Sequence, residues 1–545
     1  MNTDYSFVMK NMRILFLLFS LFPCFLFGQS NEYIVFLKGK EKLTQNKFAE
    51  RFSPRAQLQK SNYGYDFYDL PVSNTYLSEL LKEGEIINVS RWLNAVHLSS
   101  VLNQTELVDR FSFIDRIILI NQKERGELAI LETKSTFSTS DSSSYGNAFE
   151  QLEITKTISC LHDNGLDGTG VLIAVLDAGS PELDSMKAFE TLRNEGRIID
   201  TWDFEDNACF VYHKNSHGTL VSSVIAAQLD SNYLGAAPKA DYAFYLTEIG
   251  RFERNVEEFN LILGLERADS IGADICSISL GYRNFDTLQV SYSYNDMNGS
   301  TTIAVQGVNI AKRKGIIISV AAGNSGSGAG TLSSPCDADS VLCVGAIKYD
   351  STRAGFSSEG PTSDGRIKPD VVTIGQGCWF VGLDDTARFG NGTSFATPLI
   401  TGMVACLKQA HPNRSSFEIM DAVRNNSDRA SNPDIIYGWG IPNSCKVDSA
   451  LAVLDSIALG INELEKSLKF SIYPNPTNEF ITVNTTEIIE SISIIQLDGK
   501  LVTSLLPSQM NTSYKINLTE LPKGIYIIRI QSQDGRVSSK KLIKQ

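Results

Sequence analysis

The chain has 545 residues, which is more than one ordinary domain holds and enough for three or four. Hydrophobic residues make up 42% and charged residues 20%, a composition typical of folded globular domains. The formal net charge is −13, so the chain has no surplus of Lys and Arg to neutralise phosphates, and we exclude non-specific nucleic-acid binding.

The N-terminus has the pattern of an export signal. Lys10 and Arg13 precede an apolar run over residues 14–27, which is shorter than the ~20 residues needed to span a bilayer. We therefore expect a cleaved secretory signal peptide over residues 1–28. Cys24 would also suit a lipid-modified terminus, but Pro23 beside it does not fit that pattern. No later segment is long and apolar enough to cross a membrane.

Residues 29–144 alternate strand-like and helix-like segments. The pattern predicts strands over 32–40, 64–72 and 86–98, a helix over 76–81, and a helix–strand pair over 106–120. These elements suggest one small α/β domain. A Ser/Thr-rich stretch over residues 133–146 follows, and its composition is typical of an exposed, cleavable linker.

The largest block covers residues 145–457 and alternates apolar strands with helical runs. The segment 170–177 is almost continuously apolar, and the strand candidates that end near residues 281 and 321 look the same. Continuous apolar strands are expected where helices cover both faces of a parallel sheet. The block therefore predicts an α/β fold with a doubly wound, mostly parallel sheet.

The tail changes character after a linker expected at residues 458–467. Residues 468–545 consist of short strands broken by turn signals, and two Asp-Gly pairs, at 498–499 and 534–535, each lie between strand runs. Asp-Gly between two strand patterns is the strongest short-range signal for a β-hairpin. We expect a C-terminal β-sandwich.

Ser394 is the first candidate for chemistry. It lies in the sequence NGTSFATP, directly before a helix expected over residues 395–410, with Pro398 in its first turn, where a missing N–H costs little. A serine at this place either caps the helix or is a nucleophile held at its N-terminus. A hydrolytic serine needs a base, usually histidine. The chain has only five histidines: His97, His162, His213, His217 and His411.

His217 is the best candidate for the base. It begins an apolar helical run, and the small Gly218 and Thr219 leave little bulk beside its imidazole. His213 lies four residues earlier, a spacing at which two histidines on a helix can bind zinc. We expect the helix to begin only at His217, and no glutamate lies between the two histidines. His213 is therefore predicted to be a surface residue and not a metal ligand.

Two strand-end residues complete the set. Asp177 ends the apolar segment 170–177, where a carboxylate can orient an imidazole; the structural alternative is a turn cap. Asn324 follows another apolar strand, where its amide can donate to an oxyanion; the alternative is a loop residue chosen for left-handed backbone. The order Asp177, His217, Asn324, Ser394 contains the Asp–His–Ser order of subtilisin.

An α/β-hydrolase site is the main alternative for Ser394. That fold needs the pattern GxSxG, but Ala396 occupies the final glycine position. It also needs a histidine after the serine, and only His411 is available. The residue order therefore favours the subtilisin arrangement.

The pattern of cysteines favours structural roles, such as disulfides and buried side chains, over metal binding. The chain has nine, with no CxxC pair and no Cys/His cluster at zinc spacing. Cys336 and Cys343 bracket a short loop and can bridge if it folds back on itself, and an exported chain meets conditions where disulfides persist. Cys276 and Cys406 lie in apolar runs and are expected to be buried small hydrophobes.

The largest block, over residues 145–455, resembles the subtilisin-like serine peptidases. The carrying motifs are AVLDAG around Asp177, HGTLVSSVIAA from His217, SISLG at 277–281, AAGNSG around Asn324, GTSFATP around Ser394 and YGWGIPN at 437–443. The resemblance implies a secreted endopeptidase in which Ser394 attacks the scissile carbonyl. His217 would take and return the proton and Asp177 would orient His217. The amide of Asn324 and the backbone N–H of Ser394 would hold the oxyanion.

The same resemblance implies how substrate is held. Two segments resemble the family's substrate-lining strands and are expected to pair with an extended peptide through backbone hydrogen bonds. They comprise Ser279, Leu280 and Gly281, and Ala321, Ala322 and Gly323. Related chains often lack cysteines at 336 and 343, which supports that bridge. No cofactor is implied; family members often bind calcium, but no Asp-rich loop here matches a dedicated motif, and we assign no metal ligand.

The two flanking regions also resemble known domains. The N-terminal α/β domain resembles the prodomains of these enzymes, which assist folding and inhibit until cleaved. The tail resembles the sorting domain of the Bacteroidetes type IX secretion system, through FSIYPNPTNEFITV at 470–483, LDGKLV at 497–502, LPKGIYIIRI at 521–530 and the closing KKLIKQ. A carbohydrate- or substrate-binding β-sandwich is the alternative, but we see no aromatic row for a sugar.

The sequence therefore predicts a secreted or surface-attached serine endopeptidase, exported through the periplasm and the outer membrane, with polypeptide substrates and no nucleic acid. We expect it to be monomeric, with the secretion machinery as the partner of its tail. Two alternatives stay open. One is a catalytically silent subtilisin-like surface protein used for binding, and the other is a structural surface protein that uses the tail only as an address.

Overall fold

The structure is a computed structural model. It describes residues 30–40, 49–120, 145–153, 158–229, 232–249, 253–286, 290–464, 469–496, 500–506, 512–533 and 537–545. The expected signal peptide and most of the Ser/Thr-rich linker lie outside these ranges. The chain divides into two compact units, residues 1–448 and 449–545. None of the helices described is both long and apolar enough to cross a membrane.

A seven-stranded sheet forms the centre of the first unit, and every neighbouring pair whose register the structure gives is parallel. This confirms the predicted parallel sheet. The strands in spatial order are β13 (Val371–Ile374), β12 (Leu342–Ile347), β11 (Ile317–Ala321), β10 (Ile275–Ile278), β5 (Leu172–Asp177), β9 (Asp241–Leu246) and β6 (Ile198–Asp203). The order reverses around β5, which is the switch point where α/β sheets bind ligands.

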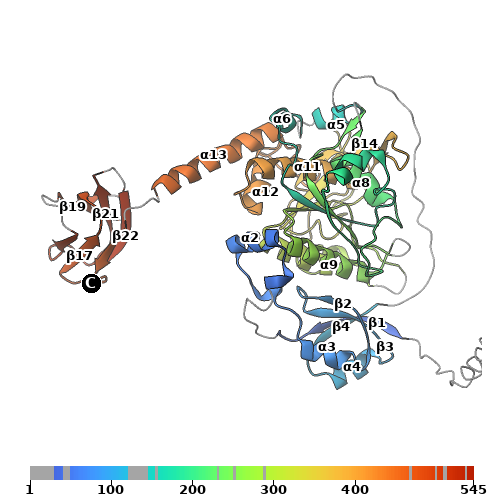
Figure 1. The fold of residues 1–545 in the computed structure, drawn as a ribbon, viewed down its shortest axis with the longest axis horizontal. Helices are drawn as coiled ribbons and strands as arrows, with labels where there is room; N and C mark the ends of the chain where they lie inside the picture. Colours follow the sequence, from blue (N-terminus) through green and yellow to red (C-terminus); the bar gives the residue numbers. More distant parts are fainter. Residues whose placement is uncertain are drawn as a thin grey trace, which may run out of the picture. The chain divides into compact units, whose positions relative to one another are not determined.

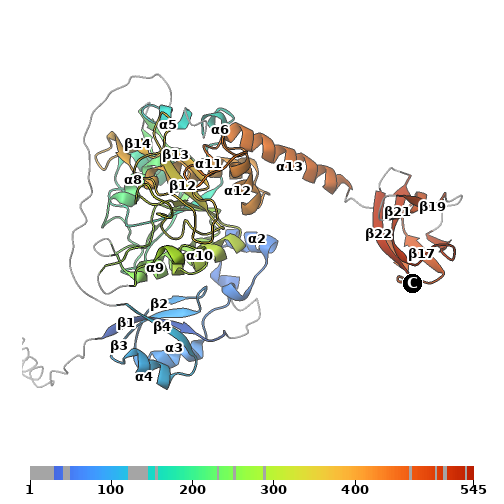
Figure 2. The same cartoon turned by 180° about the vertical axis from the view of Figure 1, so that it is seen from behind.

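Helices cover both faces of this sheet (Figures 1 and 2). On one face α8 (His217–Ala226) packs against α11 (Thr393–Ala410), and α11 crosses β10 to β13. On the other face α9 (Asn255–Ile271) packs against α10 (Ile303–Arg313). The remaining helices are α5 (Phe149–Glu153), α6 (Ser159–Asp163), α7 (Glu190–Asn194), α12 (Ser416–Asn425) and α13 (Ser444–Leu464). Because α13 continues to Leu464, most of the expected linker segment 458–467 is helical.

The N-terminal domain is a four-stranded antiparallel sheet that lies beside α9 and α10 (Figures 1 and 2). Its strands are β2 (Gly84–Ser90), β3 (Ala95–Ser100), β1 (Asn31–Leu37) and β4 (Ile114–Ile120), with helices α2 (Pro54–Tyr63), α3 (Asn74–Leu80) and α4 (Gln104–Arg110). Alternate residues of β1 point to opposite faces, as in any strand. Tyr33 and Val35 belong to a core of this domain alone, whereas Ile34 and Phe36 join the core that contains α9.

Two predicted strands of this domain were wrong. Residues 64–72 form a 3₁₀ turn over Phe67–Asp69, because Asp66 and Asp69 cap it through side-chain hydrogen bonds. The predicted strand 86–98 is two strands, β2 and β3, separated by a turn that contains Asn94 in left-handed backbone (φ 50°). The Asn94 side chain donates to Leu37 O and Gly39 O, so the turn is fixed by distant residues.

Charged side chains join the N-terminal domain to α9 and the loop after α10. Lys60 contacts Asp69 in its own domain and Asp269 on α9, both at 2.9 Å, and its side chain is only 4% exposed. Lys314 contacts Asp69 from the other side at 2.7 Å. Arg91 contacts Asp269 at 2.9 Å. The boundary between the two domains is thus a network of buried, alternating charges.

The second unit contains two antiparallel sheets around one apolar core, which gives the predicted β-sandwich. One sheet has the order β16 (Phe470–Tyr473), β17 (Phe480–Thr485) and β20 (Ser513–Asn517), and the other β19 (Leu501–Leu505), β18 (Ile489–Gln496), β21 (Gly524–Ser532) and β22 (Val537–Lys544). The pairs β18–β19 and β21–β22 confirm the two predicted hairpins, although their Asp-Gly turns lie outside the described residues.

Candidate active site

Asp177 and His217 meet at the carboxyl edge of the central sheet. Asp177 is the last residue of β5 and His217 the first of α8, and the carboxylate oxygen Oδ1 lies 2.7 Å from the ring nitrogen Nδ1. Asp177 is 2% exposed, and its other oxygen, Oδ2, is buried with no hydrogen-bond partner among the described residues. The carboxylate therefore depends on Nδ1–H of His217 and on the backbone N–H of Ala178, which also donates to Oδ1 at 2.8 Å.

The close approach of β5 and α8 requires the glycine after His217. A Cβ atom on Gly218 would lie 2.1 Å from Gly179 O and 3.0 Å from the Cβ of Asp177. The backbone N–H of His217 donates to the side chain of Asn215 at 2.9 Å, which fixes the start of the helix. The predicted helix start at His217 is correct, and the absence of a side chain at 218 brings imidazole and carboxylate together.

The surroundings change the pKa of His217 in two opposing ways. Burial lowers it, because the imidazolium loses water; the negative charge of Asp177 and its hydrogen bond raise it. Burial is the largest single effect, but the charge and hydrogen bond of Asp177 and the charge of Glu248 together outweigh it, so the pKa lies above the ordinary 6.5. A base of this kind accepts a proton readily and holds it as an imidazolium stabilised by Asp177.

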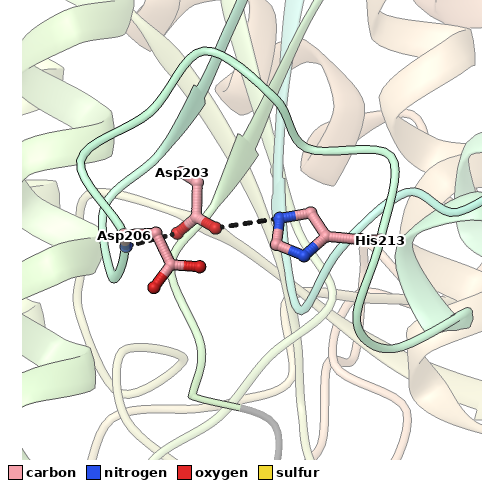
Figure 3. Close-up of side chains that lie close together, drawn as sticks. All are labelled: Asp203, Asp206 and His213. Carbon is pink, nitrogen blue, oxygen red and sulfur yellow. Dashed lines mark hydrogen bonds and ion pairs between the residues drawn. The ribbon is translucent and has the colours of Figure 1, made fainter. Parts of the chain in front are cut away.

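His213 has a different carboxylate partner, and the two histidines do not converge on one site. Its Nε2 lies 3.1 Å from Asp203 Oδ2, near Asp206 (Figure 3). Lys214 already neutralises this group, since its ammonium contacts Asp203 at 3.0 Å and Asp206 at 3.1 Å. The side chain of His213 is 32% exposed, so its prediction as a surface residue holds only in part.

Ser394 lies in the first turn of α11. The helix begins at Thr393 with Gly392 as its N-cap, so the prediction that Ser394 precedes the helix is wrong by two residues. Ser394 is 7% exposed, and its backbone N–H donates to no residue that the structure describes. The first N–H groups of a helix lack internal acceptors and carry partial positive charge, so this N–H is available to an anion.

The ring of Phe395 links this turn to His217. The centres of the Phe395 and imidazole rings are 6.4 Å apart, and Phe395 also stacks on Phe380 at 4.9 Å. No hydrogen bond joins the hydroxyl of Ser394 to His217, although both residues are described. Catalytic hydrogen bonds are often long without substrate and tighten when it binds. A Cβ on Gly392 would lie 2.7 Å from the Oγ of Ser394, so the glycine keeps this hydroxyl free.

Ser279 replaces a missing hydrogen bond of α11. The sequence pattern placed Pro398 in the first turn of the helix. Because the helix begins at Thr393, Pro398 lies in the second turn instead. Proline has no N–H to donate to the carbonyl four residues earlier, which is that of Ser394. The hydroxyl of Ser279 donates to Ser394 O at 2.9 Å instead. The side chain of Ser279 thus fixes the serine turn against the end of β10.

Asn324 is held with its amide group in a defined orientation. Its Oδ1 accepts the backbone N–H of Thr393 at 2.9 Å and the Thr393 hydroxyl at 3.0 Å. A backbone N–H can only donate, so the oxygen of this side chain must face Thr393. The exposed side chain of Asn324 therefore keeps its NH₂ group, a double donor, beside the turn that carries Ser394.

The two predicted substrate segments differ in what their backbones can bind. The described residues form no backbone hydrogen bond with Ser279, Leu280 or Gly281, which follow β10. In contrast, Ala322 N donates to Val344 O at 3.0 Å, and Gly323 N donates to the hydroxyl of Thr393 at 3.3 Å. The prediction that both segments pair with an extended peptide is therefore wrong for Ala322 and Gly323, whose N–H groups are used inside the protein. Ala321 is the last residue of β11.

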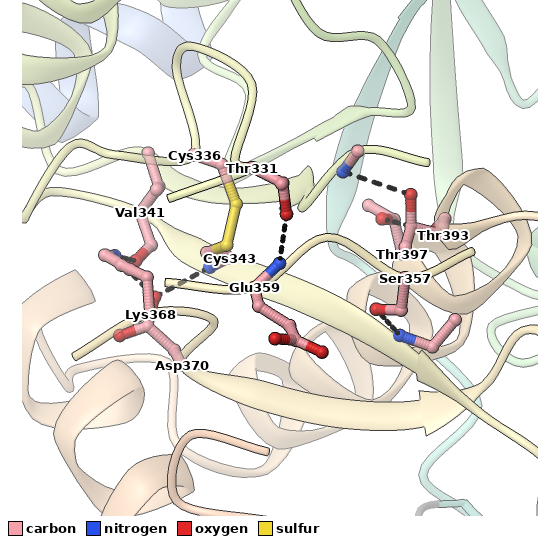
Figure 4. Close-up of a disulfide and its surroundings, with 12 residues drawn as sticks. Thr331, Cys336, Val341, Cys343, Ser357, Glu359, Lys368, Asp370, Thr393 and Thr397 are labelled. Atoms are coloured by element: carbon pink, nitrogen blue, oxygen red, sulfur yellow. Dashed lines mark hydrogen bonds and ion pairs between the residues drawn. A yellow bond between two sulfur atoms is a disulfide. The ribbon is translucent and has the colours of Figure 1, made fainter. Parts of the chain in front are cut away.

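The cysteines within the described ranges form two disulfides. Cys336 is joined to Cys343 on β12, which closes the short loop between them (Figure 4). Just before this loop, Ser333 N donates to Ala322 O at 3.1 Å. The second disulfide joins Cys160 on α6 to Cys445 on α13 across 285 residues, and nothing in the sequence pattern predicted it. Cys276 and Cys406 are free and buried, as expected of small hydrophobes.

Glu248 is a buried acid near this site that the sequence analysis missed. It lies two residues after β9, whose last residue pairs with Asp177, and it is 7% exposed. The hydroxyl of Tyr282, the residue after Gly281, donates to its Oε1 at 2.6 Å. A glutamate after a buried parallel strand, at the edge that carries Asp177, was the available signal.

Comparison with known proteins finds matches over three parts of the chain. Residues 168–440 match the subtilase family (peptidase S8), residues 32–135 a peptidase S8 propeptide domain of Bacteroidota, and residues 471–545 a secretion system C-terminal sorting domain. A tail of this last kind directs a protein to the cell surface or the extracellular space.

Two individual proteins are each similar over about half of this chain. Serine protease AprX of Bacillus subtilis (strain 168) is 30% identical over 314 residues, which are 51% of this chain and 66% of AprX. Subtilisin Savinase of Lederbergia lenta is 30% identical over 287 residues, 52% of this chain and 92% of Savinase. A crystal structure of MycP1 with the N-terminal propeptide removed aligns with a TM-score of 0.44 and 21% identity, covering 55% of this chain and 96% of MycP1.

The subtilase match spans half of the chain, a propeptide domain precedes it and a sorting domain follows it. The chain belongs to the subtilase family of serine-type endopeptidases, and it is a secreted member of that family.

Proposed function

We propose that the protein hydrolyses peptide bonds through the triad Asp177, His217 and Ser394, with an acyl-enzyme intermediate. The observation that carries the proposal is the 2.7 Å contact between Asp177 Oδ1 and His217 Nδ1, beside a helix start that carries a serine. The hydrogen bond at Nδ1 leaves Nε2 as the nitrogen that can take a proton from Ser394.

The reaction would proceed in two halves. The oxygen of Ser394 attacks the scissile carbonyl while its proton passes to His217, and collapse of the tetrahedral intermediate expels the amine, which takes that proton. The acyl group stays on Ser394. A water molecule then attacks the ester, gives a proton to His217, and the acid product leaves as Ser394 regains the proton.

Asn324 and the backbone N–H of Ser394 would stabilise the oxyanion. The NH₂ group of Asn324 has a fixed orientation because Thr393 holds its oxygen, and the N–H of Ser394 lies at the positive end of α11. Such donors are aligned before the charge develops, so they need little reorganisation during the reaction.

Substrate would pair with the backbone of Ser279, Leu280 and Gly281, whose N–H and C=O groups the described residues leave open. Ala321, Ala322 and Gly323 would line the site beside Asn324 without donating to the peptide. Side chains of the peptide would then meet the surrounding pockets, as in other cases of strand addition.

We assign the rest of the chain to export and control. Residues 1–28 would be the signal peptide, 29–144 the prodomain, 145–457 the peptidase domain and 468–545 the sorting domain, with the type IX secretion machinery as its partner. The enzyme would act as a monomer without a cofactor.

A fluorophosphonate probe tests the catalytic proposal, because it reacts only with an activated serine. We expect the secreted protein to be labelled after removal of its prodomain, and the Ser394→Ala variant to remain unlabelled. Absence of labelling in the processed wild type would favour a catalytically silent binding protein.

A further inference from the structure

Glu248 lies between the catalytic pair and the open substrate segment. Thr247, the residue before it, donates its backbone N–H to Asp177 O at 3.0 Å. On its other side the carboxylate accepts the hydroxyl of Tyr282, which follows Gly281 in the chain. Through these two contacts Glu248 adjoins both the strand end that carries Asp177 and the segment Ser279–Gly281.

The carboxylate of Glu248 is buried without a lysine or arginine partner among the described residues, and its negative charge also raises the pKa of His217. Its Oε1 accepts two hydroxyls, from Tyr282 at 2.6 Å and from Thr247 at 3.0 Å. Its Oε2 accepts no hydrogen bond, and no Lys or Arg forms an ion pair with it, in the part of the chain that the structure describes. Glu248 is only 7% exposed, and a carboxylate so deeply buried normally has a charged or bidentate partner.

Neighbouring acids add to this negative potential. Glu253 and Asp177 both repel a charge on Glu248, and Glu257 is in turn repelled by Glu248 and Glu253. Burial, followed by these charges, raises the pKa of Glu248 to about 8, although the hydroxyls of Tyr282 and Thr247 lower it. A cation bound here would remove the repulsion and recover the cost of burying the carboxylate.

We propose that Glu248 is a specificity-determining residue that binds a lysine or arginine side chain of the peptide substrate, next to the scissile bond. The inference rests on the proposed function, because it needs a peptide bound along Ser279–Gly281. Glu248 Oε2 would accept a charge-assisted hydrogen bond from the substrate's ammonium or guanidinium group.

A side-chain cation fits this position better than a metal ion. A metal needs several ligand atoms close together. Among the described residues one group of His, Asp and Glu side chains has that geometry, and it contains Asp203, Asp206 and His213 but not Glu248. An arginine or lysine needs only one or two acceptors and brings its own hydrogen-bond donors.

Matched peptides test the proposal on the processed, secreted protein. Each position that flanks the scissile bond is varied in turn, comparing arginine with its neutral isostere citrulline and lysine with norleucine. We expect one position at which the basic residue raises kcat/KM by about tenfold or more, the discrimination expected when a charged hydrogen bond is lost. In the Glu248→Gln variant, which keeps an acceptor for Tyr282, the ratio should fall below about twofold.

Glu258→Gln is the control. Glu258 is a buried glutamate that also accepts a tyrosine hydroxyl, from Tyr292 at 2.7 Å, but it lies on α9 and its acidic neighbour is Asp337. This variant should keep the wild-type ratio. Equal use of arginine and citrulline at every position by the wild type, or a preference that survives in Glu248→Gln, would overturn the proposal. Labelling by the fluorophosphonate probe is measured alongside, so failure of the catalytic proposal shows as an unlabelled wild type.

Discussion

Thr393 gives both of its hydrogen-bond donors to one atom, the side-chain oxygen of Asn324, at 2.9 and 3.0 Å. This contact joins the residue before Ser394 to the loop after β11. It leaves the NH₂ group of Asn324 free in one orientation, without help from substrate.

Replacing Asn324 by alanine should therefore lower kcat much more than it changes KM. Its hydrogen bond to the oxyanion strengthens in the transition state, and loss of such a donor lowers kcat by about 10²–10³-fold. Steady-state kinetics, normalised by titration of the active serine, measure the effect. An unchanged kcat would rule out the oxyanion role.

Thr393→Val tests whether the orientation of Asn324 matters. Valine keeps the backbone N–H that holds Asn324 Oδ1 but removes the hydroxyl, which also accepts Gly323 N at 3.3 Å. We expect kcat to fall by about fivefold, in line with one neutral hydrogen bond of about 1 kcal/mol. Thr393→Ser retains the hydroxyl and should retain most of the activity; equal losses in both variants would point to packing instead.

The pH dependence follows from the pKa of His217. Since its pKa lies above 6.5, the base is still protonated at pH values near 6.5, and kcat/KM should fall with an apparent pKa above that value as the pH drops. Asp177→Asn removes the negative charge that raises this pKa, while burial still lowers it. The activity of this variant should be about 10⁴-fold lower than that of the wild type. The acid limb of its pH–rate profile should lie at lower pH. A pH–rate profile that is flat from pH 5 to 8 would contradict His217 as the base.

The preference for basic side chains should grow with pH. Burial raises the pKa of Glu248 to about 8; Glu253 and Asp177 add to this, while the hydroxyls of Tyr282 and Thr247 favour the carboxylate. His217 also interacts with this charge, but it acts on arginine and citrulline peptides alike and so cancels in their ratio. Between pH 7 and 9 Glu248 loses its proton, so the arginine-to-citrulline ratio of kcat/KM should rise by several fold. Arginine stays charged throughout this range, so a ratio independent of pH would exclude titration of Glu248 as its source.

Gly218→Ala should separate the two members of the catalytic pair. The new Cβ would lie 2.1 Å from Gly179 O, a backbone atom that cannot move aside cheaply. A shift of about 1 Å at His217 is enough to lower activity by about 10²-fold. Gly355→Ala is the matched control, because a Cβ there meets nothing within 4 Å. Comparable activities of the two variants would contradict the need for close approach at 218.

The buried charges between the N-terminal domain and α9 should make Lys60 important for stability. Lys60→Met removes one of the two cations at each of Asp69 and Asp269, while Lys314 and Arg91 remain. We expect the free energy of unfolding to fall by about 1.5–3 kcal/mol, as for the loss of a charged hydrogen bond, which is less than for an uncompensated buried charge. The uncleaved Ser394→Ala chain provides the background, and denaturant unfolding measures the loss. Lys82, whose side chain is 62% exposed beside Glu79, is the control, with an expected change within about 0.5 kcal/mol. Equal effects at the two lysines would contradict the network.

Much of the peptidase domain could be predicted because its strands are recognisable from short stretches of sequence. β5, β10 and β11 are short, largely apolar runs, and the candidate residues Asp177, Ser279 and Asn324 lie at or within three residues of the strand ends. Parallel strands place these ends on one edge, so residues far apart in the chain could be assigned to one site.

The features that could not be predicted from the sequence involve residues whose partners are distant in the chain. Residues 64–72 alternate like a strand, but Asp69 is fixed by Lys314, 245 residues away. The position of Glu248 matters only because Tyr282 and Asp177 fold against it, and no periodicity shows that. The exact start of α11 was missed because the N-cap is Gly392, and the contact of Thr393 with Asn324 replaces a side-chain cap.

The disulfide between Cys160 and Cys445 closes a covalent ring around the peptidase. Asp177, His217, Asn324 and Ser394 all lie within the 285-residue loop that it spans. A secreted protease is exposed to cuts by its own copies in surface loops. After one such nick inside the ring, the two fragments stay tethered and can hold the site together, whereas an open chain would release a piece. Closing so long a loop also lowers the entropy of the unfolded chain, which stabilises the folded state by about 5.6 kcal/mol in the chain-entropy description. The ring therefore favours survival outside the cell, where no chaperone repairs a damaged enzyme.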